Sequence, residues 1–223
     1  RPDLRDVLMI GVSQSGGSPD LVRCLEIGRA GGALTVAVTN NAGSPLATAA
    51  HHHVDVLAGP ERAVAATKSY TAQLLALHEL LMAVRDGAPA PAALPDLGAG
   101  LIEQDAAIAA LAVRYRFAQR LLTTGRGYSY ATAREAALKL METAYVSAQA
   151  FSGADLLHGP LALVDPQVPV LAVVAEGIGG DAMQATLARL REQDADVCVI
   201  GRPAAVEAAA AGVALPGGLP ERL

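Results

Sequence analysis

The chain has 223 residues, of which 52% are hydrophobic, so it can bury the cores of two small domains. Its formal net charge at pH 7 is -5. No apolar run approaches the roughly 20 residues of a membrane span, and no secretory signal precedes the first apolar run, so we expect a soluble, cytoplasmic protein without membrane partners. The negative charge argues against the broad basic surface of a nucleic-acid binder.

Apolar runs alternate with helical patterns along the first part of the chain. This alternation predicts βαβ units and a parallel sheet. Three adjacent histidines, 51–53, are not expected to bind one metal ion together, because neighbouring side chains of an extended segment point to opposite faces, and we predict that they lie in a surface loop. In the long helix predicted from about Lys68, four apolar residues recur every three or four positions and predict a core-facing stripe: Leu74, Leu77, Leu81 and Val84. The predicted elements are strands at 7–12, 33–39 and 54–58, and helices from about Pro19, near Ser44 and from about Lys68.

A segment with prolines and glycines, 86–100, interrupts this pattern and is typical of an interdomain linker. We therefore predict a first subdomain over 1–88, a linker over 89–100 and a second subdomain over 101–223. The cycle of strands and helices then restarts. The predicted elements are helices through about Arg120, over 130–147 and over 181–193, and strands at 120–125, 161–164, 168–174 and 196–201.

The two cysteines, Cys24 and Cys198, lie far apart in the sequence and in different predicted elements. Neither has a second cysteine at the spacing of a metal site. We expect both to be buried free thiols.

The stretch "GVSQSGGSPDLV" (11–22) connects the first predicted strand to the first predicted helix. A helix N-terminus offers unpaired backbone N–H groups and the positive end of a dipole, and short hydroxyl side chains add further donors. Ser13, Gln14, Ser15 and Ser18 are therefore candidates for binding a phosphate, with Ser18 as N-cap and Pro19 at the first helical position. A simple cap and turn would explain the same residues, since the lysine of a P-loop is absent.

The stretch "REAALKLMETA" (134–144) places Glu135, Lys139 and Glu142 at i, i+4 and i+7, on one face of a predicted helix. Taken alone, these charges are explained equally well by a solvated helix with an ordinary Glu–Lys ion pair. The apolar opposite arc, however, indicates a partly buried helix, in which inward-facing charges need a reason.

Two further stretches are predicted to form corners beside the sheets. In "LLHGPLALV" (156–164), His158 precedes Gly159 and Pro160 and would be presented with little cover just before a strand. In "AGPERAVAATKSYTAQ" (58–73), the backbone from Val64 to Thr67 either lines a ligand or simply connects two elements.

Together these stretches resemble the sugar isomerase (SIS) domain family. They are most similar to the isomerase half of glutamine–fructose-6-phosphate aminotransferases and to the SIS-type glucosamine-6-phosphate deaminases. The resemblance implies an α/β fold of two SIS subdomains, each a parallel sheet flanked by helices in three αβα layers, a homodimer, and a sugar-phosphate site at the subdomain or dimer boundary. It also implies no metal and no organic cofactor. The matching stretches are "SQSGGSPD", "AGPERAVAATKSYTAQL", "GRGYSYATAREAALKLMETAYVSAQAF" and "HGPLALV".

The resemblance also implies a role for each matching position. Ser13, Gln14, Ser15 and Ser18 would hold the 6-phosphate, and Val64 and Ala65 would contact the sugar. Glu135 would order the site, Lys139 would contact the sugar or the carboxylates, Glu142 would move a proton between C1 and C2, and His158 would open the pyranose ring. Ala66 stands where the family pattern has a serine, and the family's earlier strand and its lysine-bearing C-terminal tail are expected to lie outside this chain.

The reaction expected from these residues is the conversion of glucosamine 6-phosphate to fructose 6-phosphate and ammonia. Two alternatives within enzymes stay open: the isomerase part of a glutamine-dependent aminotransferase, and a deglycase acting on a fructosamine phosphate. A third alternative is a sugar-phosphate sensor without turnover, although such a sensor would have no need of the carboxylates and the histidine.

Overall fold

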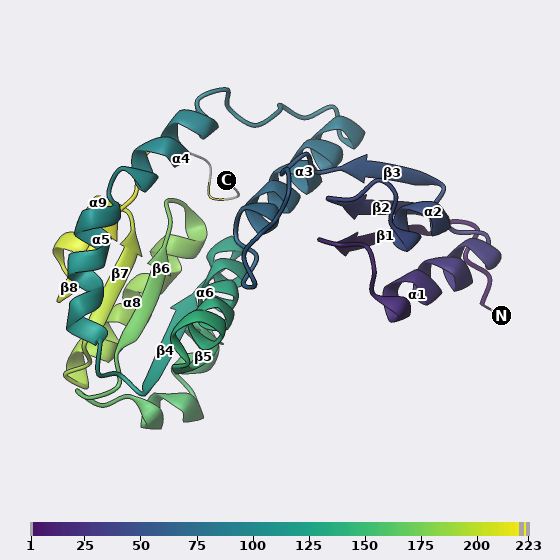
Figure 1. The fold of residues 1–223 in the computed structure, drawn as a ribbon. Helices are drawn as coiled ribbons and strands as arrows, with labels where there is room; N and C mark the ends of the chain where they lie inside the picture. The colour runs from purple at the N-terminus through teal and green to yellow at the C-terminus, as the bar shows by residue number, and fades with distance from the viewer. Residues whose placement is uncertain (1, 219–220, 222–223) are drawn as a thin grey trace. The chain divides into compact units, whose positions relative to one another are not determined.

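The computed structural model describes residues 2–218 and 221, which divide into two compact units, Arg1–Pro91 and Ala92–Leu223 (Figure 1). Both units are α/β, with parallel strands flanked by helices. The segment predicted as a linker, 89–100, is only partly extended, because helix α4 (Leu94–Ile102) begins within it.

Unit 1 contains a three-stranded parallel sheet in the order β1-β2-β3. Its small core joins Leu25 of α1 to Ala37 of β2 and Leu46 of α2. Because all three strands run in the same direction, the loops after β1, β2 and β3 emerge at one edge of the sheet. The elements are β1 (Leu8–Ser13), α1 (Pro19–Ala30), β2 (Leu34–Thr39), α2 (Pro45–Ala49), β3 (His52–Asp55) and α3 (Lys68–Val84).

The prediction that His51–His53 form a surface loop is wrong. His52 and His53 belong to β3, which pairs with β2 in the register Val36↔His52. Two buried threonines of β2 supply partners for the neighbouring rings: Thr35 Oγ1 lies 2.9 Å from His51 Nδ1, and Thr39 Oγ1 lies 2.9 Å from His53 Nε2. These contacts and the backbone pairing offset the low apolar content of the strand.

The apolar stripe of α3 is also not core-facing. Leu74, Leu81 and Val84 are 46%, 48% and 69% exposed, respectively. A repeating apolar pattern marks a face that favours burial, but it does not identify the surface that would cover it. The homodimer expected from the sequence stays a prediction.

Unit 2 contains a five-stranded parallel sheet in the order β5-β4-β6-β7-β8, with helices on both faces (Figure 1). Its elements after α4 are α5 (Asp105–Ala112), η1 (Val113–Tyr115), β4 (Arg120–Gly125), α6 (Tyr128–Ala144), β5 (Ser147–Ser152), α7 (Gly153–Leu156), η2 (Gly159–Leu163), β6 (Val170–Val174), α8 (Ile178–Glu192), β7 (Val197–Gly201), α9 (Pro203–Glu207) and β8 (Ala211–Ala214).

Alternating residues of β4 show which helices cover each face of this sheet. Thr123 donates a hydrogen bond from Oγ1 to the carbonyl of Ala133 on α6. Leu122, which points to the opposite face, belongs to the core cluster that contains Leu187 of α8 and Ala205 of α9. Helix α6 therefore lies on one face of the sheet, and α8 and α9 lie on the other.

Several predicted elements of unit 2 differ from the structure. Residues 161–164 belong largely to the 3-10 helix η2 rather than to a strand, because Pro160 starts a tight helical turn. Strands β5 and β8 were not predicted, since neither shows a clear apolar alternation.

Cys198 is buried as expected, but Cys24 is exposed. Among the described residues, no helix combines the length and apolar character needed to cross a membrane.

Candidate functional site

The corner between β1 and α1 is a tight polar turn whose shape depends on Gly16. This residue has φ +64°, and a Cβ atom at its position would lie 2.2 Å from Ser44 Oγ. Its carbonyl accepts a hydrogen bond of 3.0 Å from the backbone N–H of Leu46. Only glycine combines this left-handed conformation with such a close approach to the next loop.

The hydroxyl groups of this corner are arranged as donors. Ser13 Oγ accepts a hydrogen bond of 3.2 Å from the N–H of Gly16, and Ser15 Oγ accepts one of 3.3 Å from the N–H of Gly17. Because each hydroxyl already accepts from the backbone, its own proton can be donated to an anion.

The start of α1 adds further donors to the corner. Ser18 is the N-cap and Pro19 takes the first helical position, as predicted, but the Ser18 side chain makes no capping hydrogen bond. The Ser18 hydroxyl therefore leaves the first-turn N–H groups, at the positive end of this 12-residue helix, without a side-chain cap. Gln14 is half-buried beside them. The corner therefore has the chemistry of a phosphate site.

The loop between β3 and α3 emerges at the same edge of the unit 1 sheet. Asn40, directly after β2, ties it in place: its Nδ2 donates to the carbonyl of Gly59 at 2.7 Å, and its Oδ1 accepts from the N–H of Ala58 at 3.0 Å. At the other end, Glu61 Oε2 accepts from the N–H of Ser69 at 3.2 Å and from its Oγ at 2.8 Å. These hydrogen bonds lower the pKa of Glu61 below its ordinary value, because they favour the charged carboxylate.

Within this anchored loop, the two predicted sugar contacts differ in exposure. The side chain of Val64 is fully exposed and available to a ligand, whereas Ala65 is buried, with 8% of its surface accessible. Any contact made by Ala65 is therefore made through its backbone. Ala66, which follows, is half-buried.

In unit 2, α6 brings its three predicted charged residues together. Lys139 Nζ donates to Glu142 Oε2 at 2.7 Å and lies 3.3 Å from Glu135 Oε1. The side chains of Glu135 and Lys139 are 21% and 23% exposed, and that of Glu142 is 38% exposed. The buried face of the helix, including Ala133 and Ala137, packs against the sheet.

The ammonium group in this cluster is stabilised by both carboxylates. The hydrogen bond to Glu142 is the main cause that raises the pKa of Lys139, and the hydrogen bond to Glu135 adds to it. Two carboxylates held by one cation can exchange protons with a ligand, and the more exposed one, Glu142, is the better placed to do so.

His158 is exposed and caps the N-terminus of η2 with its backbone. Its N–H donates to Asp155 at 3.1 Å and its carbonyl accepts from Leu161 at 3.2 Å. Within the described part of the chain, no hydrogen bond fixes its imidazole, so the ring can reorient to meet a ligand. Among the described residues, no hydrogen bond or ion pair joins His158 to Glu142.

Two residues that organise this site were not identified from the sequence, Asn40 and Glu61. Both act by hydrogen bonding to residues 8 to 19 positions further along the chain, and no periodic pattern reveals such pairs. An asparagine directly after a predicted strand was the one available signal. Across residues 2–218 and 221, no group of three or more His, Cys, Asp or Glu side chains is arranged to hold a metal ion.

Comparison with known proteins links this chain to sugar-phosphate enzymes. The family model for the SIS domain matches residues 4–83 and 115–210. A glutamine–fructose-6-phosphate aminotransferase of Chlorobaculum tepidum is 35% identical over 179 residues, which cover 75% of this chain and 29% of that protein. The corresponding protein of Thermotoga maritima is 32% identical over 213 residues, which cover 90% of this chain and 35% of that protein.

A solved structure shares the same architecture. The C-terminal domain of glucosamine-fructose-6-phosphate aminotransferase from Francisella tularensis superposes with a TM-score of 0.85 at 25% identity, covering 98% of this chain and 67% of that one. The present chain spans about a third, or less, of the length of the curated relatives named above.

Proposed function

The chain belongs to the SIS domain family, and from that premise we propose that it catalyses aldose–ketose isomerisation of a phosphorylated amino sugar, with glucosamine 6-phosphate as first candidate substrate. The observation that carries this proposal is the α6 cluster, in which Lys139 Nζ lies 2.7 Å from Glu142 and 3.3 Å from Glu135. A protein that only bound sugar phosphates would not need such a cluster.

In the proposed mechanism, the corner after β1 binds the phosphate group. The hydroxyls of Ser13, Ser15 and Ser18 and the amide of Gln14 donate to the phosphate oxygens, assisted by the N-terminus of α1. This use of serine hydroxyls and backbone N–H groups suits a chain with a net charge of -5, because it needs no basic patch. The exposed side chain of Val64 and the backbone of Ala65 contact the sugar carbons.

Glu142 acts as the base. Its carboxylate removes the proton from C2 of the open-chain amino aldose, the electron pair forms a C1–C2 double bond, and the carbonyl oxygen takes up a proton, which gives an enolamine intermediate. Return of the proton to C1 and loss of a proton from the nitrogen give the 2-imino form of the ketose. Lys139 holds Glu142 in position, and Glu135 fixes the other side of the ammonium group.

His158 opens the pyranose ring before the proton transfer. Ring opening moves a proton from the C1 hydroxyl to the ring oxygen, and an imidazole can relay it because it both accepts and donates near neutral pH. The exposure of His158 and the absence of a hydrogen bond to its ring in the described residues support this assignment.

Addition of water to the 2-imino ketose yields fructose 6-phosphate and ammonia, which is the deamination expected from the sequence. An aminotransferase runs the same proton transfer in the opposite direction, with ammonia supplied from glutamine. The shared step is therefore the proposed activity of this chain, and the source or fate of the nitrogen depends on the full-length protein.

The test is to incubate the purified full-length protein with glucosamine 6-phosphate and to measure fructose 6-phosphate and ammonia separately. Glucosamine without the phosphate serves as control and is expected to react at least about tenfold more slowly, because charge-assisted hydrogen bonds to phosphate are lost. Equal amounts of both products support deamination. Saturable binding with neither product, and with no isomerisation of fructose 6-phosphate, would instead identify a sensor.

A further inference from the structure

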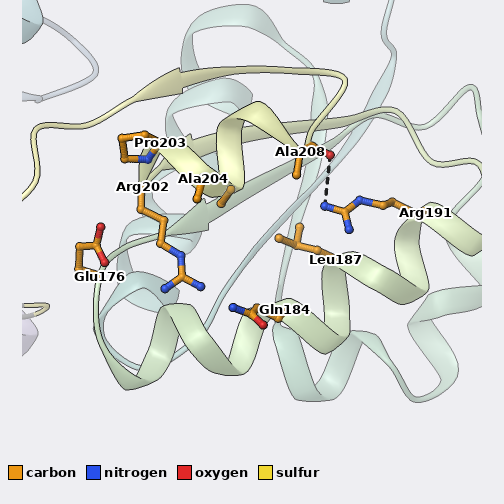
Figure 2. A pocket seen from close by; sticks show the side chains of 9 residues that line it. Glu176, Gln184, Leu187, Arg191, Arg202, Pro203, Ala204 and Ala208 are labelled. Atoms are coloured by element: carbon orange, nitrogen blue, oxygen red, sulfur yellow. Dashed lines mark hydrogen bonds between the residues drawn. The ribbon is translucent and has the colours of Figure 1, made fainter.

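A cavity lies in unit 2 in the groove between α8 and α9, on one face of the sheet (Figure 2). Its volume is about 670 Å³, which is within the range of small-molecule sites. Part of its wall is apolar and part is polar. The residues that line it are Glu176, Gln184, Leu187, Arg191, Arg202, Pro203, Ala204, Ala205 and Ala208.

Two hydrogen bonds position Arg202 at one side of this cavity. Its side chain is only 14% exposed, its Nη1 donates to Asp181 Oδ1 at 2.6 Å, and its Nη2 donates to the carbonyl of Gly180 at 3.4 Å. These contacts use two of the five N–H groups of a guanidinium. Figure 2 shows the side chain extending from the start of α9 toward Gln184, which also lines the cavity.

Arg191 is positioned on the other side of the cavity by a contact between the two helices. Its Nη2 donates to the carbonyl of Ala208 at 3.2 Å, as the dashed line in Figure 2 shows. Gln184, Leu187 and Arg191 occupy positions i, i+3 and i+7 of α8, so all three face the same groove. Leu187, which belongs to the buried core cluster, and Ala204 add apolar surface to the cavity wall.

This cavity is distinct from the α6 cluster. It lies on the face of the sheet covered by α8 and α9, whereas Thr123 anchors α6 to the opposite face. None of the residues assigned to the proposed isomerase site lines it.

We propose that the α8–α9 cavity binds a small organic phosphate, with Arg191 and Arg202 on the phosphate group and the apolar wall around Leu187 and Ala204 on its carbon body. Arginine suits this role because its planar fork matches the oxygens of a phosphate. Of the nine lining residues, one is a carboxylate, Glu176, and it is exposed. This site is independent of the proposed isomerase activity.

The test is a titration of the full chain with phenyl phosphate, followed by the backbone amide NMR signals of Leu187, Ala204 and Ala208. We expect saturable shifts at these residues. Arg191→Gln and Arg202→Gln are each expected to weaken binding at least about tenfold, the loss typical of a charged hydrogen-bonding partner. Arg189→Gln is the matched control, since Arg189 lies on the same helix, pairs with Glu192 and does not line the cavity.

Two further probes separate the parts of the proposal. Inorganic phosphate and phenol are each expected to bind more weakly than phenyl phosphate, because each lacks one of the two contacts. No saturation of these three signals below about 10 mM phenyl phosphate, or equal affinity for phenol, would overturn the site. Unchanged affinity in Arg191→Gln, which leaves the contact between Arg202 and Asp181 intact, would do so as well. Shifts in the backbone amide NMR signals of residues 13–18 report separately on binding at the proposed isomerase site.

Discussion

Lys139 donates a hydrogen bond of 2.7 Å from Nζ to Oε2 of Glu142, one turn further along α6. The same Nζ lies 3.3 Å from Glu135, so one ammonium group holds two carboxylates on a single helix face. If Glu142 is the base, Lys139 determines where its carboxylate lies when substrate binds.

Replacing Lys139 with methionine should therefore lower kcat about 10- to 100-fold, since misplacement of a catalytic group by about 1 Å has an effect of this size. Substrate affinity should change little, because the phosphate contacts lie elsewhere. Lys139→Arg keeps a cation and should recover part of the rate. Steady-state kinetics with glucosamine 6-phosphate measures both parameters, and a methionine variant with full kcat would contradict the assigned role.

The same lysine predicts a pH dependence of stability. The carboxylates raise the pKa of Lys139 above its ordinary value of about 10.4. The ion pairs of Lys139 therefore stabilise the folded state fully below about pH 10, and this stabilisation is lost as the pH rises through the folded-state pKa. The difference in free energy of unfolding between wild type and Lys139→Met should therefore stay constant from about pH 7 to 9 and shrink above about pH 10. Urea unfolding across this range measures it. If the difference in free energy of unfolding grew above pH 10, it would contradict the raised pKa of Lys139.

The anchor of the β3–α3 loop can be removed by Ser69→Ala. Ser69 is fully buried, and its hydroxyl donates to Glu61 at 2.8 Å, so the change should cost about 1 to 3 kcal/mol. Amide hydrogen exchange should accelerate over 62–68, and KM should rise more than kcat falls, since Val64 lies within that loop. Thr71→Ala, on the same helix but bonded only to the Lys68 carbonyl, is the matched control and should leave exchange over 62–68 unchanged.

The phosphate corner offers a paired test at neighbouring glycines. Gly16→Ala should destabilise the chain by about 2 kcal/mol or more and weaken sugar-phosphate binding, because φ is +64° and the new Cβ would meet Ser44. Gly17→Ala should have little effect, since its nearest neighbour would be Ser15 Oγ at 3.6 Å. Thermal unfolding and phosphate titration measure both variants. Equal effects at the two positions would show that the turn does not depend on Gly16.

The order of strands and helices was largely predictable from the sequence, because buried parallel strands are short apolar runs, as in Leu121–Leu122 of β4 and in β6. The failures have a physical cause in tertiary contacts. His52 and His53 form a strand because β2 pairs with them and Thr39 satisfies one ring. The apolar residues of α3 were predictable as a stripe, but sequence periodicity does not tell whether a stripe is covered.

The candidate site was predictable where local geometry dominates. Glu135, Lys139 and Glu142 meet because helical spacing alone brings them together. The contacts of Glu61 with Ser69 and of Asn40 with Gly59 depend on where loops fold back, and the cavity between α8 and α9 depends on the packing of two helices. No local pattern encodes these relationships.

The most direct test of the central claim follows the proton itself. The protein is incubated with glucosamine 6-phosphate in D2O, and deuterium at C1 and C2 is measured by NMR together with product formation. We predict incorporation by wild type, a loss of at least about 100-fold in Glu142→Gln, and no loss in Glu192→Gln, whose carboxylate pairs with Arg189 on α8. Incorporation at the wild-type rate in Glu142→Gln, or neither incorporation nor product in a wild-type protein that binds the sugar phosphate, would contradict the account.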